Sequence, residues 1–108
     1  MPAHQDWTIV DEREFVAVNI WTPLQDVNQQ NGSLQVLKGS HAFLPLPGDK
    51  LAPFPVFRAP TMKFKYESFQ EDIMASLTDL EVKATEAVVL NQALVHASPP
   101  NQTEDCRL

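Results

Sequence analysis

The chain has 108 residues, of which 44% are hydrophobic and 20% charged, and its formal net charge is −6. This length allows one domain at most, and we assign residues 1–108 to it. The acidic balance and the lack of a basic patch argue against a nucleic-acid partner. Cys106 is the one cysteine, which excludes an internal disulfide and fits a reducing compartment.

No targeting or membrane segment is apparent in the sequence. The first residues show no charged-then-apolar signal peptide, and no run of about 18 apolar residues predicts a membrane span. From these features we predict a cytoplasmic protein.

The first half of the chain favours β-structure. The segment Phe15–Trp21 (FVAVNIW) is rich in β-branched and aromatic residues, which predicts a buried strand. The polar segment Asn28–Gly32 (NQQNG) ends in Asn-Gly, which is typical of a hairpin turn. The next segment, Ser33–Leu37 (SLQVL), predicts a strand with Leu34 and Val36 on one face.

A turn and a long loop follow. Lys38–His41 predicts a turn, and we interpret His41 as a turn residue rather than a metal ligand. The segment Ala42–Pro60 contains five of the nine prolines and predicts a long loop. Such loops are often functional, so this one is a candidate lid or substrate-shaping insert, although its apolar residues could equally pack onto a sheet.

The second half predicts one helix and then strands. In Tyr66–Leu77 the apolar residues Phe69, Ile73 and Leu77 are spaced for one face of a short helix. The segments Ala87–Leu90 and Leu94–Ala97 predict strands.

Two short motifs near opposite ends of the chain carry candidate chemistry: His4-Gln5-Asp6 and His96-Ala97-Ser98. Residues i and i+2 of a strand point to the same side, so His4 and Asp6 can reach one metal ion. His96 must then come from another strand. Two imidazoles and one carboxylate suit Fe(II) and leave positions for substrate and dioxygen. Alone, His-x-Asp is a weak pattern, and the alternative for His4 is a frayed terminal residue.

Longer motifs surround these residues. Trp21–Val27 reads W-x-P-L-x-D-V, and Asn31–His41 reads N-G-x-L-x-V-L-x-G-S-H. Near the end, an apolar strand leads into His-x-Ser, an Asn and an Arg. With these motifs, His4–His41 and Glu81–Leu108 resemble the phytanoyl-CoA dioxygenase family of Fe(II)/2-oxoglutarate oxygenases.

The resemblance implies a role for each matching residue. His4, Asp6 and His96 would ligate iron, and Arg107 would pair with the distal carboxylate of 2-oxoglutarate, for which a guanidinium fork is suited. Ser98 and Trp21 would line the cosubstrate pocket. The alternatives are a solvated surface arginine at position 107 and simple core packing for Trp21.

The resemblance also implies a fold and a reaction. The fold is an all-β-dominated double-stranded β-helix, a cupin-like jelly roll. The reaction is hydroxylation of a small organic or lipid-like substrate by dioxygen, with release of succinate and CO2. Relatives that halogenate typically lack the carboxylate, so Asp6 favours hydroxylation. The alternatives are a metal-binding jelly roll without oxygenase activity and a non-catalytic remnant of an oxygenase.

The sequence departs from the family pattern at both ends. Three residues precede His4 and one follows Arg107, whereas family members extend further in both directions. We therefore interpret the domain as incomplete at both ends. Exposed sheet edges would favour self-association, and a ligand on a fraying strand would bind iron and cosubstrate weakly in the isolated chain.

Overall fold

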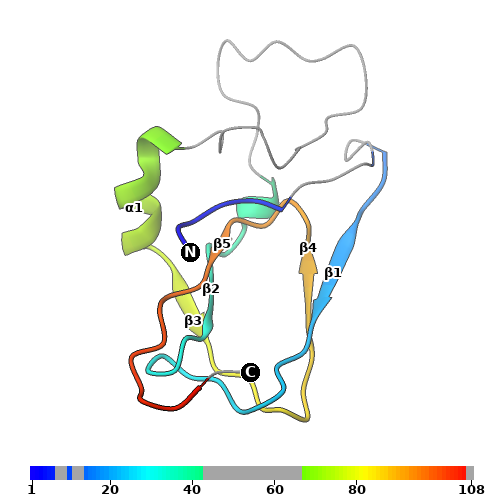
Figure 1. Cartoon of the computed structure of the whole chain (residues 1–108). Coiled ribbons are helices and arrows are strands. Elements are labelled where there is room, and N and C mark those ends of the chain that lie inside the picture. The colour runs from blue at the N-terminus through cyan, green and yellow to red at the C-terminus, as the bar shows by residue number, and fades with distance from the viewer. Residues whose placement is uncertain (7–9, 11–13, 43–66, 107–108) are drawn as a thin grey trace.

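The computed structural model describes residues 1–6, 10, 14–42 and 67–106. Within these ranges the chain is mostly strand with little helix, and its strands form two antiparallel sheets (Figure 1). The predicted Ala42–Pro60 loop lies almost wholly outside the described residues. No helix in the described ranges is long and apolar enough to cross a membrane.

The two sheets differ in size. The smaller sheet pairs β1 (Val18–Trp21) with β4 (Val88–Asn91). The larger has the order β3-β2-β5, with bounds Thr78–Leu80, Leu34–Val36 and His96–Ala97 respectively. Both sheets join strands far apart in sequence, and the N-terminal segment pairs with β5 through an isolated bridge between residues 4 and 96.

A first hydrophobic core lies between the two sheets. Side chains alternate along β1, so Asn19 and Trp21 are partly buried while Val18 and Ile20 are exposed. Leu90 of β4 is buried against the apolar face of β2, and Trp21 packs on the same cluster. The further members of this core are Leu34, Val36, Leu80, Val88 and Leu94. This packing holds the inner faces of the sheets together.

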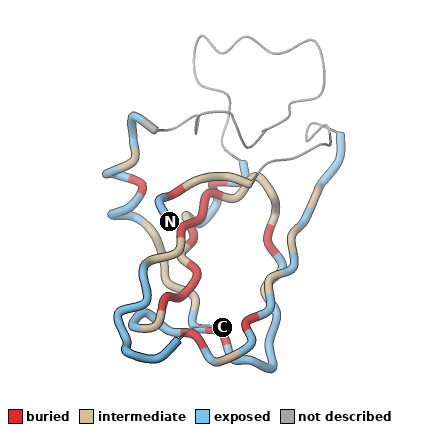
Figure 2. The backbone as a smooth tube through the Cα atoms, viewed as in Figure 1, coloured by how far each residue is buried: buried red, intermediate tan, exposed pale blue. Residues whose placement is uncertain are grey.

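A second core lies on the other face of the larger sheet. Helix α1 (Gln70–Ala75) buries Ile73 against Val95 and Ala97, and Ala3 from the first residues joins this cluster. Figure 2 shows buried positions along β2, β5 and the N-terminal segment. Since neighbouring residues of a strand face opposite ways, burial of residues 95 and 97 in this core directs His96 toward the first core.

The turn that follows β2 sets the position of β5, the strand that carries His96. The backbone N–H of Leu37 donates to the carbonyl of Val95 over 2.9 Å. Gly39 turns the chain with φ of 79°, and Ser40 begins the 3-10 turn η1 (Ser40–Ala42). The buried Ser40 hydroxyl accepts the backbone N–H of Val95 over 2.7 Å. Both backbone polar groups of Val95 are therefore satisfied at this corner.

The strands form close to the positions predicted from the sequence. β1 lies within the predicted Phe15–Trp21, Leu34 and Val36 share the buried face of β2, and strands form near both predicted C-terminal segments. The expected burial of the first strand is wrong on one face. Ile20 is 70% exposed, because no described element covers the outer face of the small sheet.

The prediction of a hairpin at Asn31-Gly32 is also wrong, although the turn itself forms. β1 pairs with β4 and β2 pairs with β3 and β5, so the turn joins two different sheets. The Asn28 side chain accepts the backbone N–H of Gln30, and the Asn31 side chain accepts that of Asn28. Gly32 has φ of 97°. Local side-chain bonds close this turn, and strand pairing is decided by packing elsewhere.

The predicted helix is present but shorter. The 3-10 turn η2 (Glu67–Phe69) leads into α1, which ends at Ala75. Ile73 is buried as expected, whereas Phe69 is 49% exposed. Strand β3 was not foreseen, because Thr78–Leu80 is too short and too polar for its pattern to stand out. The predicted self-association remains a prediction, for which the exposed apolar side chains of β1 and β4 are a physical reason.

We predict that Ser40→Ala destabilises the protein. The buried N–H of Val95 loses its partner, which costs roughly 1–3 kcal/mol. Ser76→Ala is the matched control, because the Ser76 hydroxyl donates to the carbonyl of Asp72 at an exposed site. Urea unfolding followed by circular dichroism gives the comparison. Equal midpoints for the two variants would contradict the role of Ser40.

Candidate metal centre and its pocket

The two histidines are brought together by backbone pairing. His4 donates its backbone N–H to the carbonyl of His96, and His96 donates back to His4, each over 2.9 Å. Residues directly opposite in an antiparallel pair place their side chains on the same face. The ring centroids lie 4.4 Å apart. The expected frayed position of His4 is therefore not what the structure shows.

Asp6 completes the group from the same segment. Its Oδ1 atom lies 3.5 Å from Nε2 of His96 and 3.8 Å from Nε2 of His4. The intervening Gln5 reaches elsewhere, since its Nε2 donates to the carbonyl of Ala93 over 2.6 Å. The i and i+2 arrangement predicted from the sequence is thus the one observed.

Nδ1 of each histidine ring lies against the carbonyl oxygen of the residue two positions earlier in the chain. Nδ1 of His4 lies 2.9 Å from the carbonyl oxygen of Pro2, and Nδ1 of His96 lies 2.9 Å from that of Leu94. A carbonyl can only accept, so in the neutral ring Nδ1 carries the hydrogen and Nε2 keeps its lone pair. Both lone-pair nitrogens are the atoms nearest to Asp6. This is the tautomer that a metal-binding histidine needs.

The donor set fits one metal ion. One ligand atom from each of His4, Asp6 and His96 lies within 4.8 Å of the others. With metal–ligand bonds of about 2.1 Å, two ligands of one ion lie at most about 4.2 Å apart, so small side-chain rotations suffice. His96 is buried and the other two are partly buried. His41 lies exposed in η1 and takes no part in this group, in agreement with its interpretation as a turn residue.

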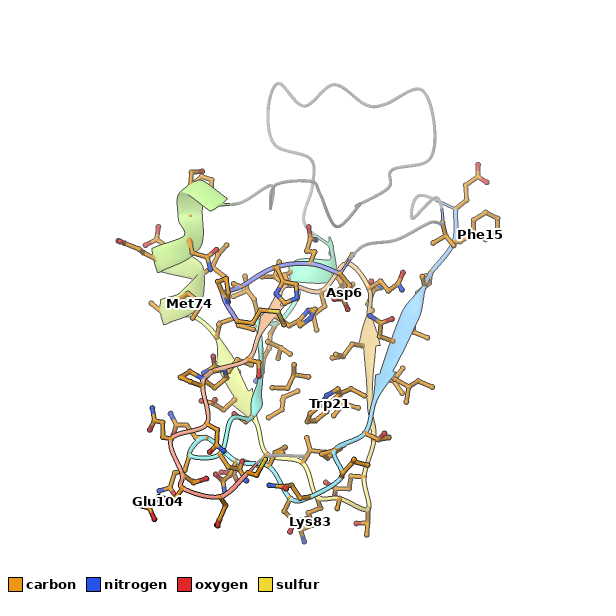
Figure 3. All side chains as sticks on the ribbon, in the orientation of Figure 1. Asp6, Phe15, Trp21, Met74, Lys83 and Glu104 are labelled. Atoms are coloured by element: carbon orange, nitrogen blue, oxygen red, sulfur yellow. The ribbon has the colours of Figure 1, made fainter. Side chains whose placement is uncertain are left out.

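A pocket of about 310 Å³ opens beside this group. That volume lies at the lower end of the range for small-molecule sites, about 300–1,000 Å³. Figure 3 shows Asp6 at one end of the two sheets and Trp21 extending between them. The lining residues are Met1, Asp6, Asn19, Ile20, Trp21, Leu34, Leu90, His96 and Ser98. Trp21 and Ser98 thus line this pocket, their role toward a cosubstrate stays a prediction, and Arg107 lies outside the described residues.

Two polar residues linked to Asp6 by hydrogen bonds were not predicted from the sequence. Asn19 of β1 donates from Nδ2 to Oδ2 of Asp6, and Gln92 donates to Oδ1 of Asn19 over 3.1 Å. One signal was available for Asn19, because asparagine is disfavoured in strands and interrupts an otherwise apolar segment. No comparable signal marks Gln92.

Comparison with known families agrees with this geometry. The model of the family described as phytanoyl-CoA dioxygenase (PhyH) matches residues 1–108. The chain therefore belongs to the phytanoyl-CoA dioxygenase family, a family of dioxygenase-type oxidoreductases. A search among curated proteins gave no match.

We predict that His96→Ala weakens Mn(II) binding by about 100-fold or more, since even outer-shell partners of metal ligands change affinity about 10–100-fold. His41→Ala is the matched control and should bind as the unmodified chain does. Competition for free Mn(II), followed by electron paramagnetic resonance, measures both. Equal losses in the two variants would contradict the assignment of the site.

Proposed function

We propose that this protein is an Fe(II)- and 2-oxoglutarate-dependent dioxygenase. It would hydroxylate a small organic or lipid-like substrate and release succinate and CO2. The observation that carries this proposal is the convergence of His4, Asp6 and His96 at the end of a pocket in a member of this family. Two antiparallel sheets with the site at one end also support a jelly-roll fold.

Each ligand residue has a physical task in this proposal. His4 and His96 would offer neutral Nε2 atoms, kept in that tautomer by backbone carbonyls. Asp6 would offer one negative charge, which partly balances a divalent ion. Fe(II) bound here supplies dioxygen activation. The protein contributes orientation and a partly enclosed site.

The remaining residues would hold the cosubstrate and exclude water. Trp21 and Leu90 give the pocket an apolar wall, and Ser98 adds a polar group close to His96 in the chain. Arg107 would bind the distal carboxylate of 2-oxoglutarate through two parallel hydrogen bonds. A carboxylate anchored at one end is oriented before reaction, which lowers the entropic part of the barrier.

We predict that Asp6→Ala abolishes formation of succinate from 2-oxoglutarate in the presence of Fe(II) and dioxygen. Asp72→Ala, a matched change on the exposed side of α1, should leave succinate formation intact. Chromatographic detection of succinate measures both. A chain that binds metal but forms no succinate would instead be a metal-binding relative without oxygenase activity.

We predict that Arg107→Lys weakens 2-oxoglutarate binding while Mn(II) affinity stays unchanged. A lysine keeps the charge but cannot form the paired hydrogen bonds of a guanidinium, so a loss of about tenfold or more is expected. Arg13→Lys is the matched control. Calorimetry of 2-oxoglutarate binding to the Mn(II)-loaded protein tests this. Unchanged cosubstrate affinity would contradict the proposed role of Arg107 in binding 2-oxoglutarate.

A further inference from the structure

A chain of side-chain hydrogen bonds leads from the small sheet to the carboxylate of Asp6. Nδ2 of Asn19 donates to Oδ2 of Asp6, and Oδ1 of Asn19 accepts from Nε2 of Gln92 over 3.1 Å. Gln92 follows β4, and its backbone N–H donates to the carbonyl of Ala17 over 2.9 Å. The three side chains thus connect the Asp6 carboxylate to the backbone ladder of β1 and β4.

These bonds define the orientation of the Asn19 amide. Rotating the amide by half a turn would set its oxygen against the Asp6 carboxylate and its NH₂ group against the NH₂ group of Gln92. Both contacts would then be repulsive. The Asp6 carboxylate, which can only accept, therefore takes the donor side of Asn19, and Gln92 stabilises this orientation by donating to Oδ1 of Asn19.

The bond to Asn19 distinguishes the two oxygens of Asp6. Oδ2 is held by Asn19, while Oδ1 is the atom that lies 3.5 Å and 3.8 Å from the two imidazole Nε2 atoms. We propose that Asn19, oriented by Gln92, is the positioning residue that presents Oδ1 of Asp6 to the metal ion. This inference rests on the proposed metal centre and assigns to it two residues outside its ligand set.

The placement of Asn19 favours this role over a purely structural one. It lies on the inward side of β1 and is paired with Leu90, beside the apolar Trp21. An apolar side chain there would extend the core between the sheets, so the amide is not needed for packing. Leucine has nearly the same shape and suits this environment. Asn19→Leu should therefore remove the donor to Asp6 while preserving the sheet.

The test is a visible-absorption titration of the whole chain with Co(II) alone. Asn19→Leu is expected to bind Co(II) about 10- to 100-fold more weakly, as for other outer-shell partners of metal ligands. Its Co(II) spectrum should also change, since Asp6 loses its fixed orientation. Affinity within about twofold of the unmodified chain, with the same spectrum, would overturn the proposal.

A double-mutant cycle distinguishes an effect carried through the hydrogen bonds from Gln92 to Asn19 to Asp6 from a general loss of stability. Gln92→Leu should weaken Co(II) binding less than Asn19→Leu, and it should cause no further loss when residue 19 is already leucine. Additive losses of Co(II) affinity would overturn the action of Gln92 through Asn19, even if Asn19→Leu lowers stability. Gln35→Leu is the matched control, because Gln35 donates to the carboxylate of Asp79 over 3.0 Å in the other sheet.

The same titration distinguishes this inference from the function on which it rests. If the unmodified chain binds Co(II), His96→Ala does not, and Asn19→Leu binds normally, only the positioning role is overturned. If the unmodified chain gives no Co(II) spectrum that depends on His96, the metal centre and the positioning role are both overturned.

Discussion

The pair of backbone hydrogen bonds between His4 and His96 is the constraint on which the site depends. It places residues from opposite ends of the chain directly across from each other, so their rings share one face of the larger sheet. Asp6 then reaches the same face two residues later. A shift of this pairing by one residue would turn His96 away and bring Val95 or Ala97 to the pocket, because side chains alternate along a strand.

Burial on the opposite face enforces this register. Ala3, Val95 and Ala97 are buried under α1, and each lies next to a histidine in the sequence. The hydrophobic core of one face thus orients the candidate metal ligands on the other face. In the small sheet, by contrast, Leu90 and Trp21 pack inward on the same face as Asn19, and this packing directs Asn19 toward the Asp6 carboxylate. Core residues and candidate metal ligands thus alternate only along the N-terminal segment and the strand that carries His96.

The sequence predicted what depends on local spacing. The shared side of His4 and Asp6 follows from a period of two, and Leu34 and Val36 follow the same rule. It could not predict pairing partners, which depend on packing between distant segments: the Asn31-Gly32 turn was interpreted as a hairpin, yet it connects two sheets. The contact of Asn19 with Asp6 could not be predicted, because the two residues are close only in the folded chain. The roles of Arg107 and of the proline-rich loop remain predictions from the sequence.

The most direct test of the account is anaerobic addition of Fe(II) and 2-oxoglutarate to this chain, followed by visible absorption. A bidentate 2-oxo acid on Fe(II) gives a weak metal-to-ligand charge-transfer band, which requires ligands and cosubstrate on one ion. At Fe(II) and 2-oxoglutarate concentrations high enough to saturate even weak binding, we expect this band with the unmodified chain and its loss in His96→Ala. Absence of the band, or a band that persists in His96→Ala, would contradict the assignment of His4, Asp6 and His96 as the iron site.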